Sequence, residues 1–135
     1  MVSTVVKAWL KPRRTVHAHC DLPCGVYDPA QARIEAESVK AIQEKYQGSD
    51  DAIFKERAVQ IKEERADLVK HHLWVLWTDY FKPEHVEKYP DLHEKFWKAT
   101  KAAGDSKKSV DPAQGQQLLD AVDEISKIFW ETKAA

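Results

Sequence analysis

Helix start signals recur along this chain and predict its fold class. The residues Asp-Pro-Ala-Gln occur at 28–31 and again at 111–114. Asp caps a helix N-terminus, Pro suits the first helical position, and Gln three residues after the cap completes a capping box. No segment shows the alternation of apolar and polar residues that is typical of a strand. The sequence therefore predicts an all-α fold.

Apolar periodicity and stop signals divide the chain into four helices. We predict them at about 29–47, 50–81, 90–103 and 112–132, with the third ending before Gly104. In the last helix one apolar stripe faces the core, formed by Leu118, Val122, Ile125 and Phe129. Because the connections are short, with 82–89 the longest, we expect an antiparallel up-down four-helix bundle. It would carry an N-terminal metal-binding segment at 19–27, here called the hook.

Two charged residues interrupt the predicted apolar stripes. Glu35 is in line with Val39 on the first helix, and Arg65 is in line with Leu68 on the second. A charge on a buried face costs several kcal/mol unless it is paired. We therefore predict a Glu35–Arg65 pair beneath the hook, with the alternative that both side chains lie at the edge of their stripes and reach water.

The second helix ends in a segment, 73–81, that is apolar nearly all round. A helix of this kind is buried on more than one side. The pattern favours contact with another subunit, although a well-covered central helix would show it too.

The hook contains the chain's two cysteines, Cys20 and Cys24, with His19 beside them. A disulfide that closes so small a loop stabilises a fold little, so the pair points to chemistry instead. Thiolates are soft donors that suit copper(I), zinc, iron–sulfur clusters and nickel. The sequence therefore predicts a metal site here.

Residues 1–18 differ in charge from the rest of the chain. They contain four basic residues and no acidic one, which leaves 19–135 net negative. Their short apolar stretch precedes the basic residues, the reverse of a secretory signal, so we expect a cytoplasmic protein. We interpret 1–18 as a cleavable basic leader and 19–135 as the hook and bundle domain, with an unprocessed N-terminal tail as the alternative.

Cleavage between Ala18 and His19 would change the donor set of the hook. The new amine, the Cys20 amide nitrogen and the thiolates of Cys20 and Cys24 would form a planar set, with the His19 imidazole above it. Such nitrogen and sulfur donors favour nickel(II) or copper(II).

The hook sequence HCDLPCGVY at 19–27 resembles the mature amino terminus of the nickel superoxide dismutase family, and the similarity continues through KHH, TDYFKPEHVEKYP and KIFWETK. The resemblance implies that nickel is held by the His19 amine and imidazole, the Cys20 amide nitrogen and sulfur, and the Cys24 sulfur. It implies cycling between Ni(II) and Ni(III), conversion of superoxide to O₂ and H₂O₂, a protease that removes the leader, and a homohexamer.

The resemblance also assigns roles around the metal. Glu35 would accept a hydrogen bond from the His19 ring, with Arg65 behind it, which fixes ring orientation and ligand basicity. Tyr27 and Tyr80 would be the catalytic tyrosines, with Tyr27 over the open face of the metal and Tyr80 close behind.

Three further residues complete the predicted site. The resemblance implies that Asp21 and Pro23 shape the hook, with a cis bond before Pro23. Because 19–135 is net negative and superoxide is an anion, steering must be local, and Lys82 is our candidate.

Other functions fit the sequence less well. A nickel or copper carrier would keep the hook but would have no need for Tyr27 beside it. A dithiol redox protein would carry Cys-x-x-Cys, not this spacing. The histidines at 70–72 and 85–93 could bind metal, yet helix histidines are more often surface or core residues. We expect no nucleic-acid partner, since no basic face remains without the leader, and no membrane segment, since none approaches about 20 apolar residues.

Overall fold

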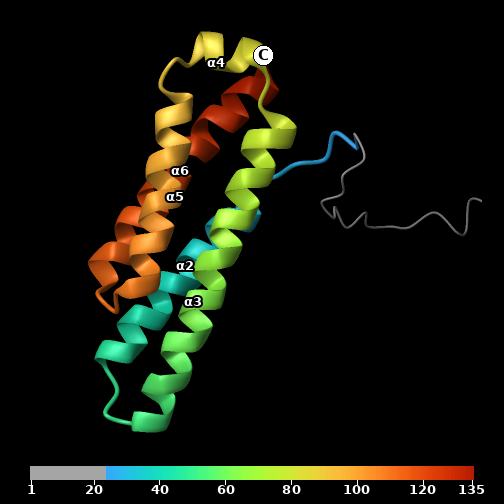
Figure 1. The fold of residues 1–135 in the computed structure, drawn as a ribbon. Helices are drawn as coiled ribbons and strands as arrows, with labels where there is room; N and C mark the ends of the chain where they lie inside the picture. The colour runs from blue at the N-terminus through green and yellow to red at the C-terminus, as the bar shows by residue number, and fades with distance from the viewer. Residues whose placement is uncertain (1–23) are drawn as a thin grey trace, which may run out of the picture.

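The computed structural model describes residues 24–135, which form an all-helical bundle (Figure 1). Its elements are α2 (Ala30–Gln47), α3 (Ala52–Val75), the π-helical turn η1 (Leu76–Tyr80), α4 (Pro83–Lys88), α5 (Leu92–Lys108) and α6 (Pro112–Ala134). Helices α2, α3, α5 and α6 pack in chain order, and α6 closes the ring against α2. The predicted all-α, up-down four-helix bundle is confirmed, and none of the described residues lies in a strand.

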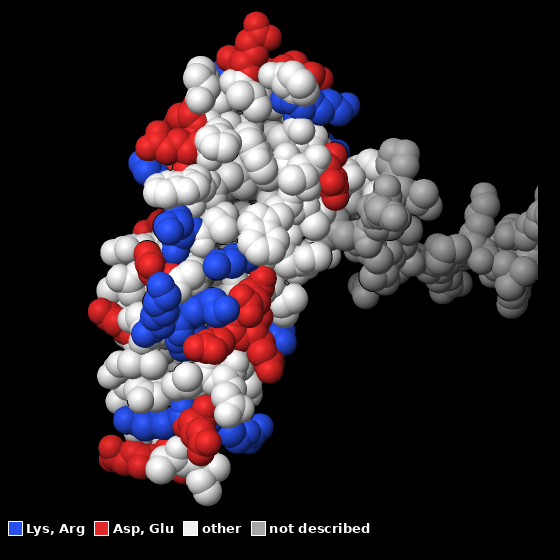
Figure 2. Space-filling model, in the orientation of Figure 1, with Lys and Arg blue, Asp and Glu red and all other residues white. Residues whose placement is uncertain are grey.

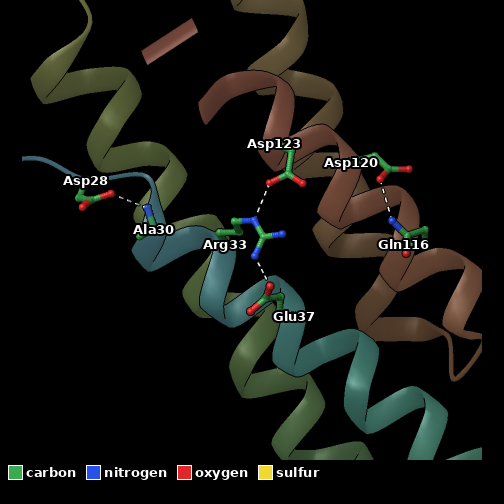
Figure 3. A network of polar contacts seen from close by, with 7 residues as sticks. All are labelled: Asp28, Ala30, Arg33, Glu37, Gln116, Asp120 and Asp123. Carbon is green, nitrogen blue, oxygen red and sulfur yellow. Dashed lines mark hydrogen bonds and ion pairs between the residues drawn. The ribbon is translucent and has the colours of Figure 1, made fainter. Parts of the chain in front are cut away.

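Both Asp-Pro-Ala-Gln segments begin a helix, as predicted. Asp28 Oδ1 accepts from the Ala30 backbone N–H at 2.9 Å (Figure 3). Asp111 Oδ1 accepts from the Ala113 N–H, also at 2.9 Å. The predicted capping box is wrong at the first of them, because Gln31 Oε1 is buried and accepts no hydrogen bond. Asp28 therefore satisfies one backbone N–H of the first turn without a capping box.

Arg33 ties the first turns of α2 to α6. Its guanidinium pairs with Glu37 on the same helix and with Asp123 Oδ1 on α6, the latter at 2.8 Å from Nε (Figure 3). The hydrogen bonds to these two carboxylates raise the pKa of Arg33 above its usual value. Since all three groups are exposed to solvent, we expect the network to contribute little to stability.

The prediction that the third helix ends before Gly104 is wrong, because α5 continues to Lys108. A single glycine costs a helix only about 1 kcal/mol, and the following turn is held by a tertiary contact. Lys62 of α3 is fully buried, and its Nζ donates to the carbonyls of Ser106 at 2.8 Å and Lys107 at 2.5 Å. A cation at a helix C-terminus is favourable, so this contact extends the helix beyond the glycine.

The predicted second helix and the link after it are more divided than expected. The helix begins at Ala52, capped by Asp51, and its last five residues form the π turn η1. The 82–89 link contains α4, which starts with Pro83 at its first position. Pro83 therefore both ends the preceding helix and begins a new one, because proline suits the first position of a helix.

The core follows the predicted stripe on α6 but not on α3. Leu118, Val122, Ile125 and Phe129 are all buried. On α3 the buried line runs through Ala58, Lys62, Ala66, Val69 and Leu73. The predicted line through Arg65 and Leu68 was therefore wrong by one position, since Ala66 and Val69 are the buried residues.

Candidate metal centre

A π turn at the end of α3 positions Tyr80. The Phe81 backbone N–H donates to the carbonyl of Leu76, five residues back, at 3.0 Å. Leu76 and Phe81 are buried, which fixes both ends of the turn in the core. Turns of this kind insert one extra residue into a helix and often mark functional sites.

Tyr80 brings the start of the described chain against the end of the bundle. Its ring centroid lies 5.6 Å from that of Tyr27, in the segment before α2, and 4.4 Å from that of Phe129 on α6. The predicted neighbourhood of Tyr27 and Tyr80 is therefore confirmed. Three elements distant in sequence meet at this point.

Cys24 lies three residues before Tyr27 and is exposed. Gly25 adopts a φ of 70°, a left-handed conformation that glycine accepts without a steric cost. The turn that follows directs the Val26 backbone N–H to Cys24 Sγ at 3.4 Å. An exposed sulfur that accepts from an N–H group suits a metal-binding thiolate.

A cavity of about 430 Å³ lies beside this cysteine, lined by Gly25, Tyr27, Asp79, Tyr80, Lys82, His85 and Lys133. The structure thus brings the predicted Tyr27, Tyr80 and Lys82 together. The two lysines on its wall outnumber the single carboxylate of Asp79, which favours an anionic ligand.

His85 and Lys133 were not predicted as site residues. The His85 ring stacks on Tyr80, with centroids 5.6 Å apart and an interplanar angle of 14°. Lys133 Nζ lies 5.2 Å from the centroid of the Tyr80 ring. Closeness to Lys82 in the sequence was a signal for His85, but nothing in the sequence placed the end of α6 here.

The predicted pair of Glu35 and Arg65 is confirmed. Arg65 Nη1 lies 3.4 Å and 3.3 Å from the two Glu35 carboxylate oxygens. The Glu35 side chain is 16% exposed and that of Arg65 36% exposed, so the pair lies at the edge of the α2–α3 contact. Arg65 Nε is buried without a hydrogen-bond partner. The contact is long for an ion pair, and part of the Arg65 guanidinium is left unsatisfied.

The remaining predicted hook residues, His19, Cys20, Asp21 and Pro23, lie outside the described residues. Within 24–135 no three His, Cys, Asp or Glu side chains gather as a metal site would require. The histidines at 70–72 and 85–93 therefore form no such cluster. Cys24 is the described member of the predicted donor set, and a thiolate together with the nitrogen and sulfur donors predicted at 19–20 would fit nickel.

Fold and site together define a helical-bundle protein that presents a cysteine beside a tyrosine-lined cationic cavity. A family model described as nickel-containing superoxide dismutase matches residues 14–133. The chain belongs to that family.

Similar proteins match over most of the chain. Superoxide dismutase [Ni] from Streptomyces coelicolor is 64% identical over 124 residues, which cover 92% of this chain and 95% of the relative. The protein of the same name from Streptomyces seoulensis has the same identity and coverage. A native nickel superoxide dismutase structure matches with a TM-score of 0.85 and 65% identity, covering 87% of this chain and 100% of that one. An apo structure matches with a TM-score of 0.81, 63% identity and coverage of 82% and 100%.

Proposed function

We propose that this chain converts superoxide into dioxygen and hydrogen peroxide at a nickel ion bound by the hook. Membership of the family supports the reaction. The observation that carries the proposal to this chain is the cavity beside Cys24, where Tyr27, Tyr80 and Lys82 meet. A site built only to store a metal would not need an anion-attracting cavity next to its sulfur ligand.

The proposed ligands are the His19 amine and imidazole, the Cys20 amide nitrogen and sulfur, and the Cys24 sulfur. Nickel held by these donors supplies a one-electron couple, Ni(II)/Ni(III), because anionic thiolate and amide donors stabilise the higher oxidation state. Two superoxide ions and two protons then give one O₂ and one H₂O₂.

The described residues orient the hook and restrict access to it. We propose that the Glu35 carboxylate accepts from the His19 ring while Arg65 holds the carboxylate in place. Tyr27 and Tyr80 narrow the approach to small molecules, and Lys82 attracts the anion toward the cavity. Asp21 and Pro23 are proposed to shape the hook.

Binding through an amine requires that a protease cut before His19. The match to the native nickel superoxide dismutase structure covers all of that chain but 87% of this one. The uncovered part of this chain is about as long as 1–18. This supports the division into a leader, 1–18, and a nickel-hook and bundle domain, 19–135. The order of apolar and basic residues in 1–18 supports the cytoplasm as the compartment.

We also propose a homohexamer. Leu73 and Leu76 are buried, but Trp74 and Trp97 are 51% and 59% exposed and line a groove between α3 and α5. Figure 2 shows a largely uncharged area on this face, with charged residues of both signs gathered beyond it. Light scattering on the trimmed protein would test the assembly.

None of the described helices is both long and apolar enough to cross a bilayer.

The decisive experiment compares the full chain with one that starts at His19, both supplied with nickel. We expect rapid superoxide removal only by the trimmed chain, and loss of removal in trimmed Cys24→Ser. Equal activity of the full and trimmed chains would contradict the amine ligand. Tight nickel binding by the trimmed chain without superoxide removal would favour the carrier instead.

A further inference from the structure

Thr132, near the end of α6, makes a hydrogen bond whose direction is fixed. Its Oγ1 lies 2.6 Å from the carbonyl oxygen of Phe129. A carbonyl can only accept, so the threonine donates, and this uses its single hydroxyl hydrogen. Towards any other neighbour, the Thr132 oxygen can act only as an acceptor.

That other neighbour is Tyr80. The phenolic oxygen of Tyr80 lies 2.7 Å from Thr132 Oγ1. Taken alone, either hydroxyl could donate in this contact. Because the Thr132 hydrogen is already committed to Phe129, the hydrogen between the two oxygens must belong to Tyr80.

We propose that Thr132 is a positioning residue that fixes the hydroxyl hydrogen of Tyr80 away from the cavity. Tyr80 lines the cavity and Thr132 does not. With its hydrogen committed to Thr132, the Tyr80 phenol has only lone pairs left with which to meet a molecule in the cavity. It accepts from protonated molecules such as hydrogen peroxide or water, and it gives no hydrogen bond to acceptor-only anions such as superoxide or azide.

Packing around the Tyr80 ring keeps this arrangement in place. The ring stacks on His85, and its centroid lies 5.0 Å from that of Phe81 and 4.4 Å from that of Phe129. With neighbours on several sides, the ring keeps its phenolic oxygen beside Thr132. The hydrogen itself can turn about the C–O bond, but only by giving up its hydrogen bond to Thr132. That Tyr80 distinguishes superoxide from hydrogen peroxide rests on the proposed function. The direction of the Tyr80–Thr132 hydrogen bond does not.

The direction can be tested by NMR on the full chain with ¹³C-labelled tyrosine, without nickel. We expect a slowly exchanging hydroxyl hydrogen on Tyr80 with a nuclear Overhauser contact to Thr132. It should persist in Thr132→Ser and in the control Thr100→Val, and be lost in Thr132→Val. Thr100 is a matched control because its hydroxyl also donates to a helix carbonyl, that of Phe96 at 2.7 Å. A hydrogen assigned to Thr132 and pointing at Tyr80, or exchange as fast as in Thr132→Val, would overturn the proposal.

The consequence for the cavity is tested with azide. Thr132→Val frees the Tyr80 hydrogen for the cavity, so azide should bind or inhibit about tenfold more tightly, while Thr132→Ser and Thr100→Val stay at the parent value. Azide-induced shifts of the Tyr80 ring signals measure this even in a chain that does not remove superoxide, which separates failure here from failure of the proposed function. Equal azide affinity in the parent and Thr132→Val would overturn the assigned role.

Discussion

Replacing Glu35 with Gln tests whether the half-buried ion pair serves the hook. Gln keeps the shape of the side chain and one oxygen for Arg65, but it removes the charge. The Glu35 side chain is 16% exposed, so its carboxylate relies on Arg65 more than on water. Arg65, at 36% exposed, can partly recover its hydration.

The magnitude follows from this asymmetry. Breaking a fully buried pair costs about 3–5 kcal/mol, and an exposed pair contributes at most about 1 kcal/mol. With one partner largely buried and the other a third exposed, we expect Glu35→Gln to lower the free energy of unfolding by about 1–2 kcal/mol. Losing a partner that orients a metal ligand typically costs tenfold to a hundredfold in metal affinity or activity. We expect nickel affinity of the trimmed protein to fall in the range of roughly 10 to 100-fold.

Glu37→Gln is the matched control, because Glu37 lies on the same helix and pairs with Arg33 in the open, at 50% exposed. We expect it to change stability by less than about 0.5 kcal/mol and to leave nickel affinity unchanged. Urea unfolding and competition with a nickel chelator measure the two quantities. Equal nickel affinity in both variants would refute the role given to Glu35.

Three further experiments probe other parts of the molecule. Gly104→Ala should stabilise by about 0.5–1 kcal/mol, because its Cβ would meet only the mobile end of a lysine at 3.4 Å, whereas Gly115→Ala should destabilise by about 1–3 kcal/mol, because its Cβ would lie 2.7 Å from a backbone atom of α2; thermal unfolding would show opposite signs. Burial lowers the pKa of Lys62 from its usual value of 10.5, so near that pH the unfolded chain binds more protons than the folded one. The parent should therefore gain stability relative to Lys62→Met as pH rises. Urea unfolding of both proteins from about pH 7 to 10 measures this, and a constant difference in stability would contradict it. Lys82→Ala should slow superoxide removal by roughly threefold at low salt and flatten its salt dependence. Lys108→Ala, at the C-terminal end of α5, should do neither in pulse-radiolysis measurements.

Much of the fold could be predicted because local signals and burial agree. Asp28 and Asp111 cap helices as their sequence context predicts, and the α6 stripe is buried from Leu118 to Phe129. Gly104 misled the prediction because the contact that carries α5 past it comes from Lys62, distant in sequence. A local signal cannot report such a contact.

Within the described residues, the sequence placed Tyr27, Tyr80 and Lys82 in one site through the resemblance, and it paired Glu35 with Arg65 through a charge on an apolar stripe. The structure added what depends on three-dimensional packing. Lys133 and Thr132 reach Tyr80 only because α6 ends beside η1. No local sequence signal predicted the π turn. It is held by the burial of Leu76 and Phe81 on either side of it, which only the folded structure shows.

That extra residue in η1 separates two demands on one helix. Upstream of Leu76 the phase of α3 is set by the bundle, and downstream the phenol of Tyr80 must meet α6. Deleting one residue between them would rotate every later side chain by about 100°, the angle per residue of an α-helix. After such a deletion the helices upstream could still pack, but the Tyr80 ring would point away from Tyr27. The inserted residue therefore allows the packing of α3 and the direction of the Tyr80 side chain to change separately.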